Sequence, residues 1–199
     1  MILAVATQAT AATPQISENL GIYLKACSDM MTALSNKDTG LMNKTIDLFS
    51  CADYGELTQE DIMEPSGNAG KPDFSFCYED AEKLMNSSFD LALLDPDHMV
   101  RATAPELNLH HFSLEPSQTY SFSVECQGTT QVTATSGLPG AVPALSVADI
   151  TNGNVSTEGS PLDGYHATMA VVEQPGEGLL RISVTNTDSE KRTFVVILN

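Results

Sequence analysis

The chain has 199 residues, which is enough for one sizeable core or for two small units. Its 26 acidic residues against 9 basic ones give a net charge of -17, which repels the phosphates of nucleic acids and anionic lipid head groups. We therefore expect no nucleic-acid partner, and no membrane insertion either, because no stretch approaches the roughly 20 consecutive apolar residues that span a bilayer.

Residues 1–12 resemble the end of a secretory signal peptide. The segment starts apolar, and Ala9-Thr10-Ala11 is a small-x-small triplet of the kind after which signal peptidases cut. No lysine or arginine precedes the apolar run. Two interpretations stay open: a signal whose start lies upstream, or an apolar leading segment. We expect export to the periplasm or to the extracellular space.

A helical hairpin is predicted next. Residues 13–36 carry apolar side chains at three-and-four spacing, typical of an amphipathic helix, with Thr13 as N-cap and Pro14 at the first helical position. The segment from Asn36 to Gly40 interrupts this pattern. A shorter helix over about 41–49 is expected to fold back on the first.

The helical region is predicted to extend to residue 98. Residues 63–74 hold two prolines and two glycines and should form a loop. A third helix is predicted from about 75 to 94, ending at Asp95 because the residue before a proline is pushed out of the helical conformation. We thus expect a helical domain over residues 13–98.

From Leu107 onward, apolar and polar side chains alternate with period two. In Tyr120-Ser-Phe-Ser-Val124 the apolar residues share one face, as a half-buried strand requires. The predicted strands are 107–114, 119–126, 129–135, 144–149, 165–173, 178–185 and 192–198, with an eighth if 153–157 pairs. Strands of this kind bury their apolar faces against a second sheet. The predicted fold class is α+β: a unit of about three helices, then an antiparallel β-sandwich of jelly-roll or Greek-key type over 107–199.

Histidines are the candidates for catalysis, and a cysteine nucleophile, Cys51 or Cys77 beside a histidine, stays open as an alternative to a structural role for these cysteines. Leu107 and Leu109 alternate in one register and Phe112 in the other, which predicts a bulge at His110-His111. The sequence has no H-E-x-x-H zinc motif and no G-x-S-x-G elbow. The candidate residues for a hydrolytic site are His98, His110 and His111.

The strand region resembles a known family. The residues that carry the likeness are Phe112-Ser-Leu-Glu-Pro-Ser-Gln-Thr-Tyr-Ser-Phe-Ser-Val124, then Thr130-Gln-Val-Thr-Ala-Thr135, Gly178-Leu-Leu-Arg-Ile-Ser-Val-Thr-Asn-Thr187 and Thr193-Phe-Val-Val-Ile-Leu198. Over about residues 107–199 they resemble bacterial pre-peptidase C-terminal domains. That resemblance implies a jelly-roll-like sandwich that serves secreted bacterial enzymes as a non-catalytic accessory or substrate-binding module.

Two acidic loops are candidates for calcium. Between Ala102 and Leu180 the chain has no lysine or arginine, which fits either solubility in an exported setting or divalent cation binding. The candidate ligands are Asp149, Asn152 and Asn154 in one loop, and Asp95 with Asp97 in another. Neither loop matches the EF-hand pattern, and turn formation by Asp and Asn side chains is the alternative. No other cofactor is expected.

Four cysteines without C-x-x-C spacing argue against a zinc ribbon or a thioredoxin-like motif. They are Cys27, Cys51, Cys77 and Cys126. Either they are buried thiols or they form disulfides, and in the second case the hairpin geometry favours Cys27 with Cys51, leaving Cys77 to pair with Cys126.

Three functions follow from these patterns. The leading hypothesis is an exported, non-catalytic binding or accessory protein that recognises a protein or glycan surface. The second is a small secreted hydrolase with a histidine and a carboxylate at the junction of the two halves. The third is a structural subunit of a surface assembly, for which we expect an exposed apolar patch or an unpaired edge strand.

Overall fold

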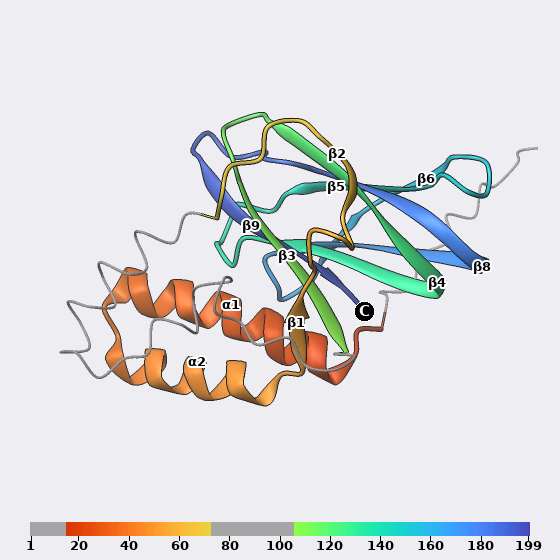
Figure 1. Cartoon of the computed structure of the whole chain (residues 1–199). Coiled ribbons are helices and arrows are strands. Elements are labelled where there is room, and N and C mark those ends of the chain that lie inside the picture. Colours follow the sequence, from red (N-terminus) through yellow and green to blue (C-terminus); the bar gives the residue numbers. More distant parts are fainter. Residues whose placement is uncertain (1–14, 73–105) are drawn as a thin grey trace, which may run out of the picture.

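The computed structural model describes residues 15–72 and 106–199 (Figure 1). These residues form an α+β fold, as predicted. The elements are α1 (Glu18–Asn36), α2 (Thr39–Cys51), β1 (Tyr54–Glu56), β2 (Met63–Ser66), β3 (Leu107–Leu114), β4 (Thr119–Thr135), β5 (Ala144–Asp149), β6 (Val155–Glu158), β7 (Ser160–Leu162), β8 (Ala167–Thr185) and β9 (Arg192–Leu198). The predicted third helix and residues 1–12 lie outside the described residues.

The helical hairpin forms as expected, but its first helix begins later than predicted. Ser17 caps α1, because its backbone is extended and its side chain accepts a hydrogen bond from the N–H of Leu20. The predicted cap at Thr13 is therefore wrong. Lys37 ends the helix in the left-handed conformation, and Asp38 caps α2 through the N–H of Leu41.

Two long strands connect the layers of the sandwich. β4 and β8 pair with each other along almost their whole length, with a register shift between Gln127 and Thr129, where Gly128 has a φ of 74°. The first half of β4 lies in one layer with the second half of β8, β5, β6 and β2. The second half of β4 lies in the other layer with β9, β3, β1, the first half of β8 and β7. The predicted strands 119–126 and 129–135 are thus one continuous bent strand, β4, and the predicted strands 165–173 and 178–185 are another, β8.

Apolar side chains fill two cores, one on each side of the layer that contains β3 and β9. One core lies between the two layers and includes Phe122, Ile182 and Val196. The other lies beneath α1 and α2, where Leu109 and Ile197 pack against the helices, which cover the outer face of this layer (Figure 1).

This double burial corrects the predicted bulge at His110-His111. β3 pairs with β9 in unbroken register from Asn108 to Leu114. Leu109 faces the helices and Phe112 faces the other layer, so both apolar registers are buried without any irregularity.

The segment before residue 72 supplies two strands to the sheet. β1 runs parallel to β3, and Tyr54 pairs with Leu107. β2 pairs antiparallel with β4, so the prediction of a loop throughout 63–74 is wrong for its first four residues. Pro65 is compatible with this position because β2 pairs only with β4 among the described strands, and an edge strand tolerates a missing N–H.

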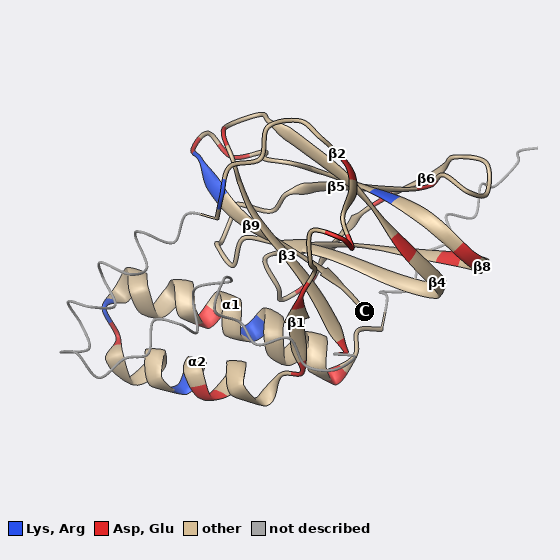
Figure 2. Cartoon of the chain, in the orientation of Figure 1, with Lys and Arg blue, Asp and Glu red and all other residues tan. Residues whose placement is uncertain are grey.

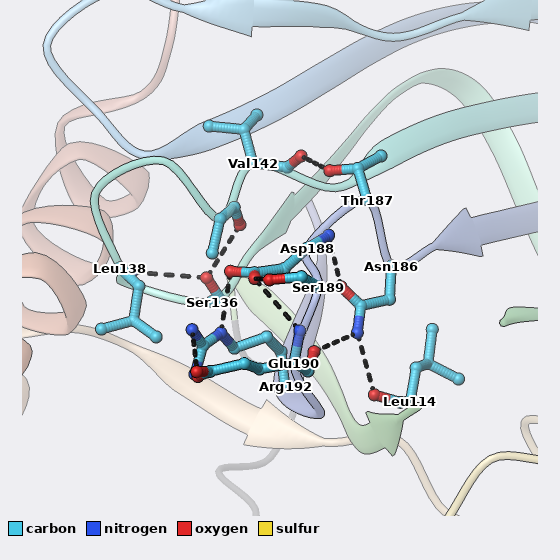
Figure 3. A network of polar contacts seen from close by, with 11 residues as sticks. Leu114, Ser136, Leu138, Val142, Asn186, Thr187, Asp188, Ser189, Glu190 and Arg192 are labelled. Atoms are coloured by element: carbon cyan, nitrogen blue, oxygen red, sulfur yellow. Dashed lines mark hydrogen bonds and ion pairs between the residues drawn. The ribbon is translucent and has the colours of Figure 1, made fainter. Parts of the chain in front are cut away.

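Hydrogen bonds close one end of the sandwich, at the turn between β8 and β9 (Figure 3). Asn186 is 1% exposed, and its Nδ2 donates to the carbonyls of Leu114 at 3.0 Å and Glu190 at 2.8 Å. Its Oδ1 accepts from the N–H of Asp188 at 2.9 Å. Arg192 binds the carboxylate of Asp188 through Nε at 3.0 Å. We call residues 186–192 with the carbonyl of Leu114 the capped end.

Candidate binding groove

Two adjoining hollows lie at the opposite end of β3 and β9, which we call the open end. Their volumes are about 470 and 450 Å³. Both are lined by Met63, Glu125, Cys126 and Gln127. The first continues between the β1–β2 loop and the last residues of β9, and the second continues to the bend of β8. Together they form one groove.

The groove exists because the strands beside β4 separate. Ser123 still pairs with Met63 of β2, whereas Gln131 already exchanges backbone hydrogen bonds of 3.0 and 3.1 Å with Asn199, just beyond β9. β2 belongs to one layer and β9 to the other. Between these two pairings, the outer edge of β4 over residues 124–130 has no strand partner among the described residues. We call this stretch the free edge.

The groove combines an apolar floor with acidic walls. The apolar lining residues are Leu57, Met63, Val124, Leu179 and Leu198. The carboxylates are Glu60, Asp61, Glu125 and Glu177. Among the described residues, no lysine, arginine or histidine lines either hollow, and Figure 2 shows acidic positions on β4 and β8 near their bends. The groove therefore offers hydrogen-bond acceptors and negative charge.

Two of the lining side chains are constrained by their surroundings. One carboxylate oxygen of Asp61 accepts from the N–H of Thr58 at 2.7 Å and from its hydroxyl at 2.6 Å, which fixes the β1–β2 loop. Burial raises the pKa of the Cys126 thiol, against a smaller lowering by its hydrogen bond to Thr130. Cys126 is thus a neutral thiol at neutral pH and a poor nucleophile.

The structure places His110 inside the sandwich, away from the groove. Its Nε2 lies 3.4 Å from the hydroxyl of Tyr120, and its ring is 5.3 Å from that of Phe112 and 4.8 Å from that of Phe122. Burial, with a smaller contribution from His111, lowers the pKa of His110 to about 4. His110 is therefore a neutral member of an aromatic cluster.

His111 points to the opposite face of β3, as neighbouring residues on a regular strand must. Its Nδ1 lies 2.5 Å from a carboxylate oxygen of Glu56, and the two side chains are 7% and 19% exposed. Tyr23 and Cys27 belong to the same helix-covered region, and burial, followed by the charges of Cys27 and Glu56, raises the pKa of Tyr23. The pair is a histidine and a carboxylate at the junction of the helices and the sandwich, but it lines neither hollow.

The loop after β5 forms an Asp-type turn. One carboxylate oxygen of Asp149 accepts from the N–H groups of Thr151 at 3.1 Å and Asn152 at 3.0 Å, and the other accepts from Asn152 Nδ2 at 2.9 Å. Asn154 donates its N–H to the backbone carbonyl of Asp149. The described residues contain no cluster of three or more His, Cys, Asp or Glu side chains arranged for a metal. Calcium at Asp149, Asn152 and Asn154 stays a prediction.

Cys27, Cys51 and Cys126 carry free thiols, so the pairing of Cys27 with Cys51 is absent. The reason is their orientation: Cys27 packs against the core beneath the helices, where burial raises its pKa to about 12, whereas Cys51 is exposed. His98, Asp95, Asp97 and Cys77 lie outside the described residues.

The sequence did not point to the groove residues. Glu125 and Gln127 occupy the polar positions of an alternating strand, which is the usual pattern of a solvated face. The one local signal is Gly128, which lies between the predicted strands 119–126 and 129–135 and marks the bend where the neighbouring strands separate.

Comparisons with known proteins do not assign the chain to a family. No family model matches it, and no curated protein matches it. Among solved structures, the pre-peptidase C-terminal domain of a collagenase from Bacillus anthracis aligns at 5% identity, covering 74% of this chain and 95% of that domain, with a TM-score of 0.31. A family 32 carbohydrate-binding module from C. perfringens NanJ, in complex with galactose, aligns at 10% identity over 68% of this chain and 93% of the module, with a TM-score of 0.29.

A third solved structure is a carbohydrate-binding module in complex with β-1,4-galactotriose. It aligns at 18% identity over 45% of this chain and 68% of the module, with a TM-score of 0.29. Superpositions at this level assign no function and no site residue. The described part of the chain contains no helix that is long and apolar enough to cross a membrane.

Proposed function

We propose that the protein is an exported, non-catalytic binding module whose groove at the open end holds a segment of a protein or glycan surface. The observation that carries this proposal is the composition of the groove. Its walls present carboxylates, amides and hydroxyls around an apolar floor, which suits recognition. Its described lining residues include no histidine, and burial raises the pKa of the Cys126 thiol, so neither a histidine base nor an activated cysteine is found among them.

The hydrolase alternative has one observation in its favour, the contact between His111 and Glu56. The contact is enclosed, with the His111 side chain only 7% exposed. The nearby thiol of Cys27 has its pKa raised to about 12 by burial, and so stays protonated. A structural contact between a side chain of β1 and one of β3 accounts for the same geometry without a reaction.

The structural-subunit alternative finds little support at Val155 and β6. Val155 is the one exposed large hydrophobic residue in the described part of the chain, at 66% exposure, and it does not form a patch by itself. It lies on β6, which ends the sheet. The edge is four residues long and flanked by exposed polar side chains, which is the usual protection against edge-to-edge assembly.

Arrays of immobilised oligosaccharides and peptides test the binding role. Gln127 is exposed and lines both hollows, so Gln127→Trp should fill the groove without disturbing a core. Ser156→Trp is the matched control, at an exposed strand position outside the groove. We expect the wild-type protein and the Ser156 variant to bind the same array members and the Gln127 variant to lose them. Equal binding by all three proteins would contradict a site in the groove.

A further inference from the structure

We infer that the ligand of the groove is an extended, basic segment of a partner protein, which adds as a strand to the free edge of β4. This inference rests on the proposed binding function and names its ligand class. Two independent features of the groove support it: a strand edge without a partner strand among the described residues, and an acidic lining whose described residues include no lysine, arginine or histidine.

The first feature concerns the main chain. A strand edge presents N–H and C=O groups at fixed spacing, and an extended peptide satisfies them by pairing as an additional strand. The free edge over 124–130 follows about 23 Å of chain at 3.3 Å per residue, with the bend at Gly128 between its two halves. It is bounded by the pairings of Ser123 with Met63 and of Gln131 with Asn199. A partner strand would therefore continue a ladder that β2 and β9 already form on either side.

The second feature concerns charge. Glu60, Glu125 and Glu177 are exposed at the groove. Side chains of an added strand alternate between two faces, so one set would meet the apolar floor and the other the carboxylates. A segment that alternates lysine or arginine with aliphatic residues fits both surfaces. The acidic field would also accelerate association with such a segment.

A glycan or a second copy of the chain would fit the free edge and the acidic walls less well than a basic peptide. A neutral glycan has no positive charge for Glu60, Glu125 and Glu177 and no repeating N–H and C=O groups for the free edge. None of the described lining residues is aromatic, so they offer no aromatic face on which a sugar ring could stack. A second copy of this chain carries a net charge of -17 and is repelled. A basic peptide is the occupant that both features favour.

The probe is a fluorescent synthetic peptide that alternates lysine with valine over about ten residues. Two matched peptides accompany it: one with glutamate in place of lysine, and one with N-methyl groups on alternate amides. We expect the lysine peptide to bind. We expect the glutamate peptide not to bind, and N-methylation, in the register that faces the edge, to weaken binding more than tenfold because it removes main-chain donors.

Charge variants of the protein test the acidic walls. Glu125→Gln combined with Glu177→Gln should weaken binding of the lysine peptide by about three- to tenfold, and raising the salt concentration should weaken it further. The control combines Glu158→Gln with Asp163→Asn, two exposed acids outside the hollows. It changes the net charge equally and should leave affinity within about twofold of wild type.

Alkylation of thiols locates the bound peptide. Cys126 lines both hollows and Cys51 is exposed on α2, so the lysine peptide should slow alkylation of Cys126 and leave that of Cys51 unchanged. Mass spectrometry of the digested protein reads each site separately. Mildly alkaline buffer is needed because the pKa of Cys126 is raised.

Four outcomes overturn the inference. Binding that is insensitive to N-methylation, or that Gln127→Trp leaves unchanged, would mean unspecific attraction to an acidic surface. If an oligosaccharide binds the wild type but not the Gln127→Trp variant, and no peptide binds, the peptide ligand is refuted. The proposed binding function of the groove would then still stand. If no member of either array depends on Gln127, the proposed function fails as well.

Discussion

The two ends of the sandwich share β3 and β9 but differ in their polar groups, which are hydrogen-bonded within the chain at one end and exposed to solvent at the other. At the capped end, the buried side chain of Asn186 hydrogen-bonds to three separate backbone groups (Figure 3). At the open end, carboxylates such as Glu125 face solvent and the edge of β4 lacks a strand partner in the described chain. Polar groups that are hydrogen-bonded within the chain stabilise the fold, whereas polar groups that face solvent are available to a ligand.

The difference between the two ends arises from the connections and pairing partners of the strands. After β8, the chain returns to β9 through a short turn, and the groups of that turn satisfy one another within a few residues. At the other end, β2 and β9 approach the same edge of β4 from different layers and leave residues 124–130 between them. The contrast predicts that substitutions at the capped end change stability, and that substitutions at the open end change binding.

The largest expected effect is at Asn186. Asn186→Ala leaves the carbonyls of Leu114 and Glu190 and the N–H of Asp188 without the side chain that bonds them. We expect the free energy of unfolding to fall by about 4 kcal/mol, measured by urea denaturation. The matched substitution at the open end is Gln127→Ala, which should change it by less than about 0.5 kcal/mol. Similar losses at both ends would contradict the division of roles.

The second prediction concerns pH and His110, which lies between the two ends. Its pKa in the folded protein is about 4, below its ordinary value of 6.5, so the unfolded chain binds the proton more tightly. The free energy of unfolding that neutral His110 contributes above pH 6.5 is therefore lost as the pH falls. At pH 4 the loss is about 3 kcal/mol. His110→Phe keeps an aromatic ring beside Phe112 and Tyr120 and cannot be protonated.

Urea denaturation of the wild type and of His110→Phe at pH 7.5 and at pH 4 separates this contribution from all others. The two proteins should be similar at the higher pH, and the variant should be more stable at the lower pH. An equal loss of stability in both proteins would assign the acid sensitivity to other groups.

His110 also shows what the sequence could predict. Period-two alternation located β3 and β9 correctly, because half-buried strands carry that pattern. The change of register at His110-His111 was wrongly predicted to be a bulge, because that prediction assumed that only one face of β3 is buried. The helices cover the second face, so Leu109 and Phe112 are both buried on a regular strand. Which strand the helices cover is a long-range fact that no local pattern encodes.

The groove escaped prediction for a related reason. Each of its side chains is ordinary in its own segment: Met63 follows a loop pattern, Glu125 is a polar strand position, and Leu198 belongs to an apolar run. Only the pairing of β2 and β9 with different parts of β4 brings them together. Tertiary pairing created this site, whereas catalytic motifs, when they exist, are often visible in one segment.

A smaller effect on stability is expected for the acidic walls of the groove. Glu125→Gln with Glu177→Gln removes two exposed like charges from a chain whose net charge is -17. The free energy of unfolding should stay the same or rise by less than about 1 kcal/mol, with the difference shrinking at high salt. Thermal and urea denaturation at two salt concentrations measure it. A clear loss of stability would show that these carboxylates hold the fold, and would weaken their assignment to a ligand.

The smallest expected effect is that of calcium on the loop after β5. Calcium binds six to eight oxygens, whereas both carboxylate oxygens of Asp149 already accept hydrogen bonds from Thr151 and Asn152. These bonds lower the pKa of Asp149, the side-chain bond from Asn152 most of all, so they favour the carboxylate without any ion. Millimolar calcium should leave the midpoint of thermal unfolding unchanged. A rise that Asp149→Asn abolishes would instead require the turn to open, because the ion and the N–H groups compete for the same two oxygens.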